Sequence, residues 1–350
     1  MIIVLLPGCA SVEDKIPERS IEAGKLWPMP PMESRIRYIR SISSPADIAA
    51  QKKPGLFAKA LRFLTGGERT GGHSIARPYG IYFDSKKGEL YVADTGLKGI
   101  HKYDLASGKS GFLDRAGETY FEMPVGVVVV NKKIYITDTV LKKLFITDLD
   151  GDLIREIEGW SRPGGIAYDA LNGRIYVVDV LEGTVKALDL EGNYLFEFGQ
   201  KGGKSGELHL PSNVWADRKG NVYVSDSMNF RIQVFDSRGY QLASISQLGD
   251  GSGDLARPKG VAVDSDGNIY VVDSNFNNVQ IFDIKGRLLL FFGESGSRKP
   301  GQFNLPTGIF IDGSNRVYVA DAYNARIQVF QYLESNEGSD ITSGAPGLAR

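Results

Sequence analysis

The sequence of 350 residues contains few of the side chains that most often bind transition metals or act as nucleophiles. It has one cysteine, Cys9, and three histidines, His73, His101 and His209. A single cysteine excludes an intrachain disulfide and any zinc site built on several cysteines. None of the histidines has metal-ligand spacing to another, and no Gly-x-Ser-x-Gly nucleophile elbow is present. We therefore predict no catalytic residue, no metal and no cofactor.

The chain also lacks an excess of charge of either sign and lacks long apolar runs. The 41 lysines and arginines nearly balance the 42 aspartates and glutamates, which leaves a net charge of −1. This balance argues against a general binder of polyanions, so we predict no nucleic-acid partner. Beyond the first few residues, no segment approaches the roughly 20 apolar residues that are needed to span a bilayer.

The chain contains a repeat instead. Five Pro-x-Gly triplets and one degenerate Pro-Ser-Asn triplet recur 39 to 48 residues apart. They begin at Pro78, Pro124, Pro163, Pro211, Pro258 and Pro306. The predicted second strand of each repeat ends in an aspartate, at Asp94, Asp138, Asp179, Asp226, Asp273 and Asp321. A period of about 40–50 residues is that of a four-stranded β-propeller blade, so the repeat predicts a propeller.

The last repeat shows how the ring would close. Residues Leu305 to Phe330 predict three short strands, and a polar tail then follows instead of a fourth. Residues 35–43 alternate as a strand but have no repeat of their own. We therefore predict an all-β, six-bladed propeller of four-stranded antiparallel blades, in which this N-terminal strand completes the last blade and covers an unpaired edge.

Two segments carry a family resemblance. Gly260 to Asp283, GVAVDSDGNIYVVDSNFNNVQIFD, and the Leu305 to Phe330 unit resemble NHL repeats, whose domains form six-bladed propellers. The resemblance extends over about residues 66–332. It implies a platform for interactions more than an enzyme, although a fold alone does not name a function.

The N-terminus resembles the end of a bacterial lipoprotein signal, with an apolar run closing on Leu-Pro-Gly-Cys9. This resemblance implies export, lipidation of Cys9 and a place on the periplasmic side of a membrane; the alternative is a short apolar N-terminus with an incidental cysteine. We assign residues 1–9 to the signal, 10–34 to an extended linker, 35–332 to the propeller and 333–350 to a disordered tail. Within the propeller, residues 54–65 predict a short helical insertion.

Loop residues that differ between repeats are the candidates for binding. In a propeller the turns after the second strands and the links into the first strands share one face. That face would carry Tyr79, Lys259, Asn229, Arg231, Asn275, Tyr323, Asn324 and Arg326. Such a polar, aromatic and cationic surface suits a peptide, a glycan or an anionic ligand. Alternatively, Arg231 and Arg326 recur with the repeat and pair with a carboxylate of a neighbouring blade.

The six repeated aspartates are assigned a structural role. Equivalent positions in a ring lie about one blade apart, too far for paired carboxylate chemistry or for the shell of one cation. Each aspartate is expected to accept backbone N–H bonds within its own turn.

These patterns favour a monomeric, non-catalytic binding platform in the bacterial cell envelope, which presents one propeller face to a protein, a peptide or a glycan. Two alternatives remain open. One is a metal-dependent propeller lyase or lactonase-type hydrolase, and the other is an RNA-binding NHL domain.

Overall fold

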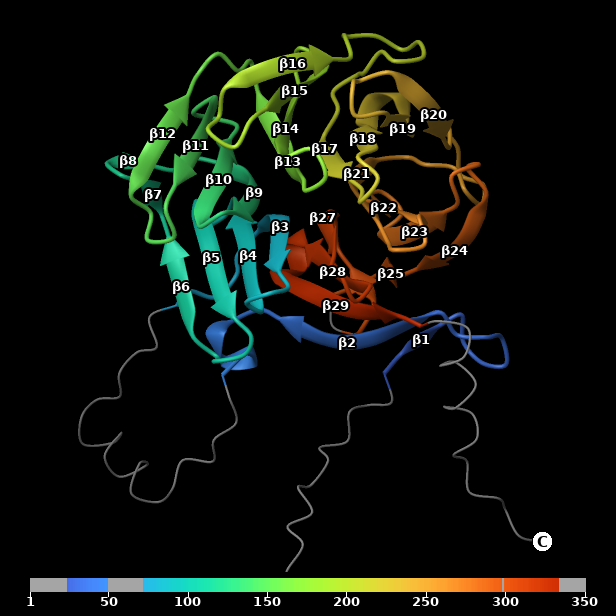
Figure 1. Cartoon of the computed structure of the whole chain (residues 1–350). Helices are drawn as coiled ribbons and strands as arrows, with labels where there is room; N and C mark the ends of the chain where they lie inside the picture. Colours follow the sequence, from blue (N-terminus) through green and yellow to red (C-terminus); the bar gives the residue numbers. More distant parts are fainter. Residues whose placement is uncertain (1–23, 50–71, 298, 334–350) are drawn as a thin grey trace, which may run out of the picture.

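The computed structural model describes residues 24–49, 72–297 and 299–333. Within these ranges, six antiparallel sheets are arranged as blades around a central channel (Figure 1). The repeat predicted this six-bladed architecture, which is confirmed. No helix in the described ranges is long and apolar enough to cross a membrane.

Each blade runs from an inner strand at the channel to an outer strand at the rim. Blade one contains β3 (Pro78–Asp84), β4 (Glu89–Asp94), β5 (Gly99–Asp104) and β6 (Ser110–Leu113). Blade two contains β9 (Pro124–Val130), β10 (Lys133–Asp138), β11 (Lys143–Thr147) and β12 (Leu153–Ile157). Blade three contains β13 (Pro163–Asp169), β14 (Arg174–Asp179), β15 (Thr184–Leu188) and β16 (Tyr194–Phe198).

The remaining blades follow the same order. Blade four contains β17 (Asn213–Ala216), β18 (Val222–Asp226), β19 (Arg231–Phe235) and β20 (Gln241–Ile245). Blade five contains β21 (Pro258–Val263), β22 (Ile269–Asp273), β23 (Asn278–Phe282) and β24 (Leu288–Phe292). Blade six contains β27 (Pro306–Ile311), β28 (Arg316–Asp321), β29 (Arg326–Tyr332), β2 (Ile36–Ile42) and β1 (Leu26–Trp27).

Several short elements lie in the links and turns. They are β7 (Arg115–Ala116), β8 (Thr119–Tyr120), β25 (Glu294–Ser295), β26 (Gln302–Phe303) and the 3-10 turns η1 (Pro45–Asp47), η2 (Ser227–Asn229) and η3 (Ala322–Asn324).

The two ends of the described chain meet in blade six. Strand β2 pairs antiparallel with β29, from Ile36 opposite Tyr332 to Ile42 opposite Ile327 (Figure 1). The predicted closure by residues 35–43 is therefore confirmed. Strand β1, within residues assigned to the linker, pairs with β2, so this sheet begins earlier than the sequence predicted. The lipidation site Cys9, the helix predicted at 54–65 and the predicted tail beyond Leu333 lie outside the described residues. Leu333, which was assigned to the tail at 333–350, is buried and its N–H donates to the Arg35 oxygen.

The apolar core is divided among the spaces between adjacent blades. The faces of neighbouring sheets pack together because their strands carry Val, Ile, Phe and Tyr at alternating positions. Links between blades add a fully buried residue to these spaces, as Leu208, Leu255 and Phe303 show. This packing holds six inner strands around the channel and thereby positions every side chain that lines it.

Candidate functional site

The Pro-x-Gly triplets surround one end of the channel, here called the proline mouth and defined by the x residues Tyr79, Val125, Gly164, Ser212, Lys259 and Thr307. Adjacent inner strands approach closely there. A Cβ added to Gly308 would lie 2.0 Å from the Tyr79 carbonyl oxygen, and one added to Gly80 would lie 2.5 Å from the Val125 oxygen. The Ser212 hydroxyl also donates to the Lys259 oxygen at 2.9 Å. Gly80 and Gly308 are thus required where these inner strands approach each other, whereas blade four carries Asn213 at the same position.

The six repeated aspartates anchor the chain just before these triplets. Asp94 accepts hydrogen bonds from the backbone N–H groups of Ala76 and Arg77 at 2.7 and 2.9 Å. The other five aspartates accept corresponding bonds from their own links, and all six are fully buried. Each carboxylate also receives hydrogen bonds from the turn that follows its strand or from side chains near it. The aspartates therefore fix the link in all six blades, and in every blade except blade three they also fix the turn at the proline mouth.

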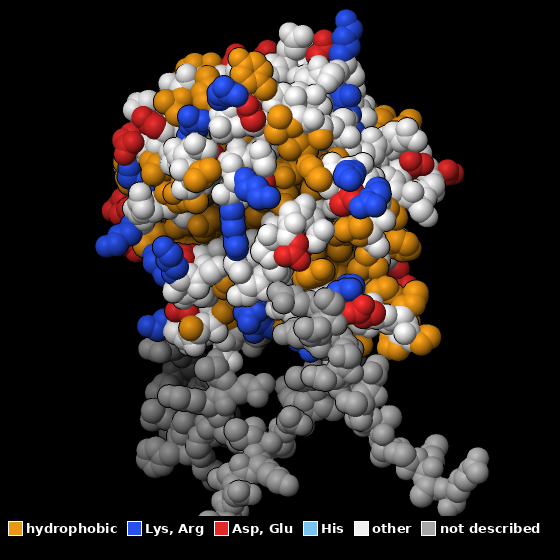
Figure 2. Space-filling model, turned by 45° about the vertical axis from the view of Figure 1, so that its right-hand side comes forward, with side chains coloured by type: hydrophobic (Ala, Val, Ile, Leu, Met, Phe, Trp, Pro, Cys, Tyr) orange, Lys and Arg blue, Asp and Glu red, His pale blue; other side chains and the backbone are white. Residues whose placement is uncertain are grey.

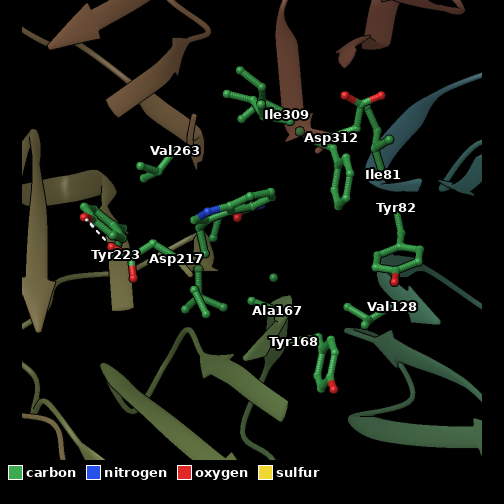
Figure 3. Close-up of a pocket in the computed structure, with 18 of the residues that line it drawn as sticks. Ile81, Tyr82, Val128, Ala167, Tyr168, Asp217, Tyr223, Val263, Ile309 and Asp312 are labelled. Carbon is green, nitrogen blue, oxygen red and sulfur yellow. Dashed lines mark hydrogen bonds between the residues drawn. The ribbon is translucent and has the colours of Figure 1, made fainter. Parts of the chain in front are cut away.

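The channel contains a cavity of about 420 Å³ that all six inner strands line (Figure 3). Its walls run from the glycines of the triplets to the hairpins that join first and second strands. Exposed residues stand at the hairpin end, among them Ser85, Arg218 and Asp266, so the cavity opens there. We call this end the aspartate mouth, after Asp217, Asp264 and Asp312, which lie on its hairpins.

Aromatic side chains from different blades meet inside the cavity. The Phe310 ring of blade six lies 5.3 Å from that of Tyr82 in blade one and 5.3 Å from that of Trp215 in blade four, both in edge-to-face geometry. Blade five lies between blades four and six but contributes only the small Ala262 at the corresponding position. The buried indole N–H of Trp215 bonds to no described residue. The cavity thus offers aromatic side chains to a ligand.

The carboxylates of the aspartate mouth are occupied by their own hairpins. Asp217 accepts hydrogen bonds from the backbone N–H groups of Lys219 and Asn221 and, at 3.0 Å, from the Tyr223 hydroxyl (Figure 3). Asp264 and Asp312 repeat this pattern. Burial and the Asp217 charge raise the pKa of Tyr223, so its hydroxyl stays a neutral donor. In the described ranges, no three His, Cys, Asp or Glu side chains form a group that could hold a metal.

The structure divides the eight residues that the sequence placed on a binding face. Four of them bond internally. Arg231 donates to Asp226 at 2.8 Å and Arg326 donates to Asp321 at 2.8 Å, each within its own blade and not with a neighbouring one. Asn229 and Asn324 donate to the same aspartates and to the carbonyl oxygens of adjoining links.

The other four surround or flank the proline mouth. Tyr79 and Lys259 are half-buried at the mouth itself, while Asn275 and Tyr323 are exposed on the turns beside it. The Arg77 guanidinium lies 5.0 Å from the centroid of the Tyr323 ring. The aromatic cavity opens at the opposite mouth, and its residues were not predicted as a site.

The fold resembles solved propellers at low sequence identity. An auxiliary nutrient binding protein from Bacteroides thetaiotaomicron aligns with a TM-score of 0.58 and 16% identity over 75% of this chain and 70% of its own. A virginiamycin B lyase from Staphylococcus aureus aligns with a TM-score of 0.55 and 13% identity over 73% of this chain and 95% of its own. A luciferin-regenerating enzyme aligns with a TM-score of 0.54 and 13% identity over 74% and 92%.

A family model also matches part of the sequence. The model, described as NHL repeat, matches residues 255–282 and 303–330. These segments cover most of the first three strands of blades five and six, where the sequence resemblance was noted. The chain therefore carries NHL repeats within a six-bladed β-propeller.

Proposed function

We propose that this protein is a non-catalytic binding module of the bacterial cell envelope, and that it takes its ligand into the aromatic cavity at the aspartate mouth. The observation that carries this proposal is the meeting of Tyr82, Phe310 and Trp215 inside an open cavity of about 420 Å³. Preformed cavities of this size, with aromatic walls and polar groups held at fixed places, are typical of sites for small ligands. Sugar rings and aromatic or aliphatic peptide side chains present faces that such walls can contact.

The fold relatives support a binding role. Two propellers from Bacteroides species are described as auxiliary nutrient binding proteins, and they align with TM-scores of 0.58 and 0.59. The proline-mouth face remains the proposed contact for a protein, peptide or glycan partner, through the exposed Asn275 and Tyr323. Export and lipidation of Cys9 would put both surfaces on the periplasmic side of the membrane.

The second candidate is a metal-dependent lyase or lactonase-type hydrolase, for which the similarity to a virginiamycin B lyase is the supporting observation. That similarity concerns the fold. The third candidate, RNA binding, needs an extended basic face. On the side shown in Figure 2, lysine and arginine side chains are dispersed among apolar ones and do not form one patch.

Tryptophan fluorescence can test the first proposal because the chain has only three tryptophans, Trp27, Trp160 and Trp215. In the double variant Trp27→Phe/Trp160→Phe, all tryptophan emission comes from the channel. A panel of oligosaccharides and di- and tripeptides should include a compound that shifts this emission saturably. The same compound should leave the emission of a Trp27→Phe/Trp215→Phe variant unchanged, since Trp160 lies outside the cavity.

Metal analysis of the same purified protein distinguishes the second candidate, the metal-dependent lyase or hydrolase, from the binding module. A compound that binds by calorimetry without changing Trp215 emission would place the ligand outside the cavity. Stoichiometric metal, with turnover of a lactone or a cyclic ester by the metal-loaded protein, would favour the hydrolase or lyase instead.

A further inference from the structure

Cationic side chains surround the proline mouth in an alternating pattern. The residue before each triplet proline is Arg77, Met123, Arg162, Leu210, Arg257 or Leu305, from blade one to blade six. Arginine therefore stands on blades one, three and five, with an apolar residue between each pair. The aspartate of each of these three blades accepts a hydrogen bond from the arginine backbone N–H, at 2.9, 2.9 and 3.0 Å. The backbone of each of these three arginines is thus held in place around one opening of the channel.

Two further donors stand inside this ring of arginines. Lys259 and Tyr79 occupy the x positions of blades five and one, and both are half-buried. Neither the Lys259 ammonium nor the Tyr79 hydroxyl bonds to another residue in the part of the chain that the structure describes. Burial and the nearby charges of Arg257 and Arg162 lower the pKa of Lys259 to about 8. Lys259 therefore lies close to like charges that no partner balances.

The carboxylates near this mouth are already engaged. Asp94 bonds to His101 at 3.0 Å and Asp179 pairs with Lys186 at 3.2 Å. Asp273 accepts its hydrogen bonds from four backbone N–H groups. On the surface, Glu122 pairs with Lys98 and Glu182 accepts a bond from Ser161.

The arginines themselves have only weak partners. The Arg77 guanidinium lies over the Tyr323 ring, and the Arg162 Nε donates to the Thr139 hydroxyl at 3.3 Å. Among the described residues, none of the three arginines forms an ion pair through its side chain. The proline mouth therefore keeps an excess of positive charge and of hydrogen-bond donors.

We propose that the proline mouth is an oxyanion site, which binds a phosphate or carboxylate group of a small molecule between Lys259, Arg162 and Arg257, with the Tyr79 hydroxyl as a further donor. Guanidinium groups match both kinds of oxyanion because their N–H donors lie in one plane. A bound anion would also relieve the repulsion between Lys259 and the two arginines. This site lies at the opposite end of the channel from the aromatic cavity and does not depend on a ligand there.

The test measures calorimetric binding of inorganic pyrophosphate and of citrate to the full chain at constant ionic strength. Lys259→Gln and the double variant Arg162→Gln/Arg257→Gln should each weaken binding by about tenfold or more, because each removes charge-assisted hydrogen bonds. Lys259→Arg keeps the charge and should retain most of the affinity. The matched control is Lys86→Gln/Lys132→Gln, which removes two exposed positive charges from hairpins at the other end of the channel, outside the cavity lining, and should leave binding unchanged.

The two probes distinguish the source of the anionic group. Binding of pyrophosphate alone indicates a phosphate site, binding of citrate alone indicates a carboxylate site, and binding of both indicates a general oxyanion site. Absence of binding to the wild-type protein would overturn the proposal. An equal loss in the control variant would also overturn it, because binding would then follow net charge. Circular dichroism of each variant establishes that it is folded.

Discussion

The repeated aspartate is buried in all six blades, but the side chain that stands beside it differs. Seven residues after the aspartate the blades carry His101, Phe145, Lys186, Gln233, Gln280 and Gln328. His101 Nε2 lies 3.0 Å from Asp94, and Gln233 and Gln328 donate to their aspartates at the same distance. The side chain at this position therefore bonds to the aspartate in blades one, three, four and six. In blade five Gln280 donates to the Asp254 carbonyl oxygen instead, and in blade two Phe145 is apolar.

Substitutions of His101 should show what this donor contributes. His101→Gln restores the donor of blades four and six and should leave the free energy of unfolding nearly unchanged. His101→Phe, which copies blade two, removes the hydrogen bond and should lower the free energy of unfolding by about 1–3 kcal/mol. Urea unfolding at neutral pH measures both. Equal losses in the two variants would mean that ring packing, and not the hydrogen bond, is what matters.

The pH dependence of this effect has a definite sign. Although burial acts to raise it, the hydrogen bonds from His101 and from the backbone N–H groups of Ala76, Leu97 and Arg77 lower the pKa of Asp94 to about 2. A carboxylate whose pKa is lowered by folding stabilises the protein above its unfolded pKa, and this contribution is lost as pH falls from about 4 to about 2. The difference between wild type and His101→Phe should therefore shrink over that interval.

At the scale of the element, the triplet glycine sets how closely two inner strands approach. Gly308→Ala would put a Cβ 2.0 Å from the Tyr79 carbonyl oxygen on the next blade, and overpacking of this kind costs about 1–3 kcal/mol. Gly111, in the outer strand β6, has no atom within 4 Å of its Cβ direction. Gly111→Ala is the matched control and should not lower the urea midpoint. Equal midpoints for the two variants would show that the inner strands can move apart.

The blades could be predicted from the sequence because their signals are local and repeated. Proline and aspartate mark the same positions six times and glycine five times, and strand alternation fills the intervals. The aromatic cavity could not be predicted from the sequence, because alternation does not say whether an inner-strand residue faces a neighbouring blade or the channel. Tyr82, Trp215 and Phe310 share one position of the repeat, but their meeting depends on the small Ala262 between blades four and six. Likewise, the bonds of Arg231 and Arg326 within their own blades depend on side-chain direction.

At the scale of the whole molecule, the ring is closed by one strand that comes from the other end of the chain. Strand β2 covers the edge of β29, and Ile36 places a fully buried side chain beside Phe330 in the core between blades five and six. Without β2, the edge of β29 would expose unpaired N–H and C=O groups, which promote association between sheets. Closure therefore depends on contacts between residues about 300 positions apart, and forming these contacts costs the entropy of closing a long loop.

Two aspartate substitutions in β2 distinguish the loss of ring closure from the effect of adding a charge to the strand. Ile36→Asp buries a carboxylate without a partner and should cost several kcal/mol, enough to release β2 from the sheet. Ile39 lies at the register shift of the same strand and is 37% exposed, so Ile39→Asp should leave stability within about 1 kcal/mol of wild type. Urea unfolding followed by tryptophan fluorescence reports the release, because Trp27 packs against Phe330. Size-exclusion chromatography reports association through the open edge. If Ile36→Asp unfolds at the wild-type urea concentration and stays monomeric, the ring does not require its N-terminal strand.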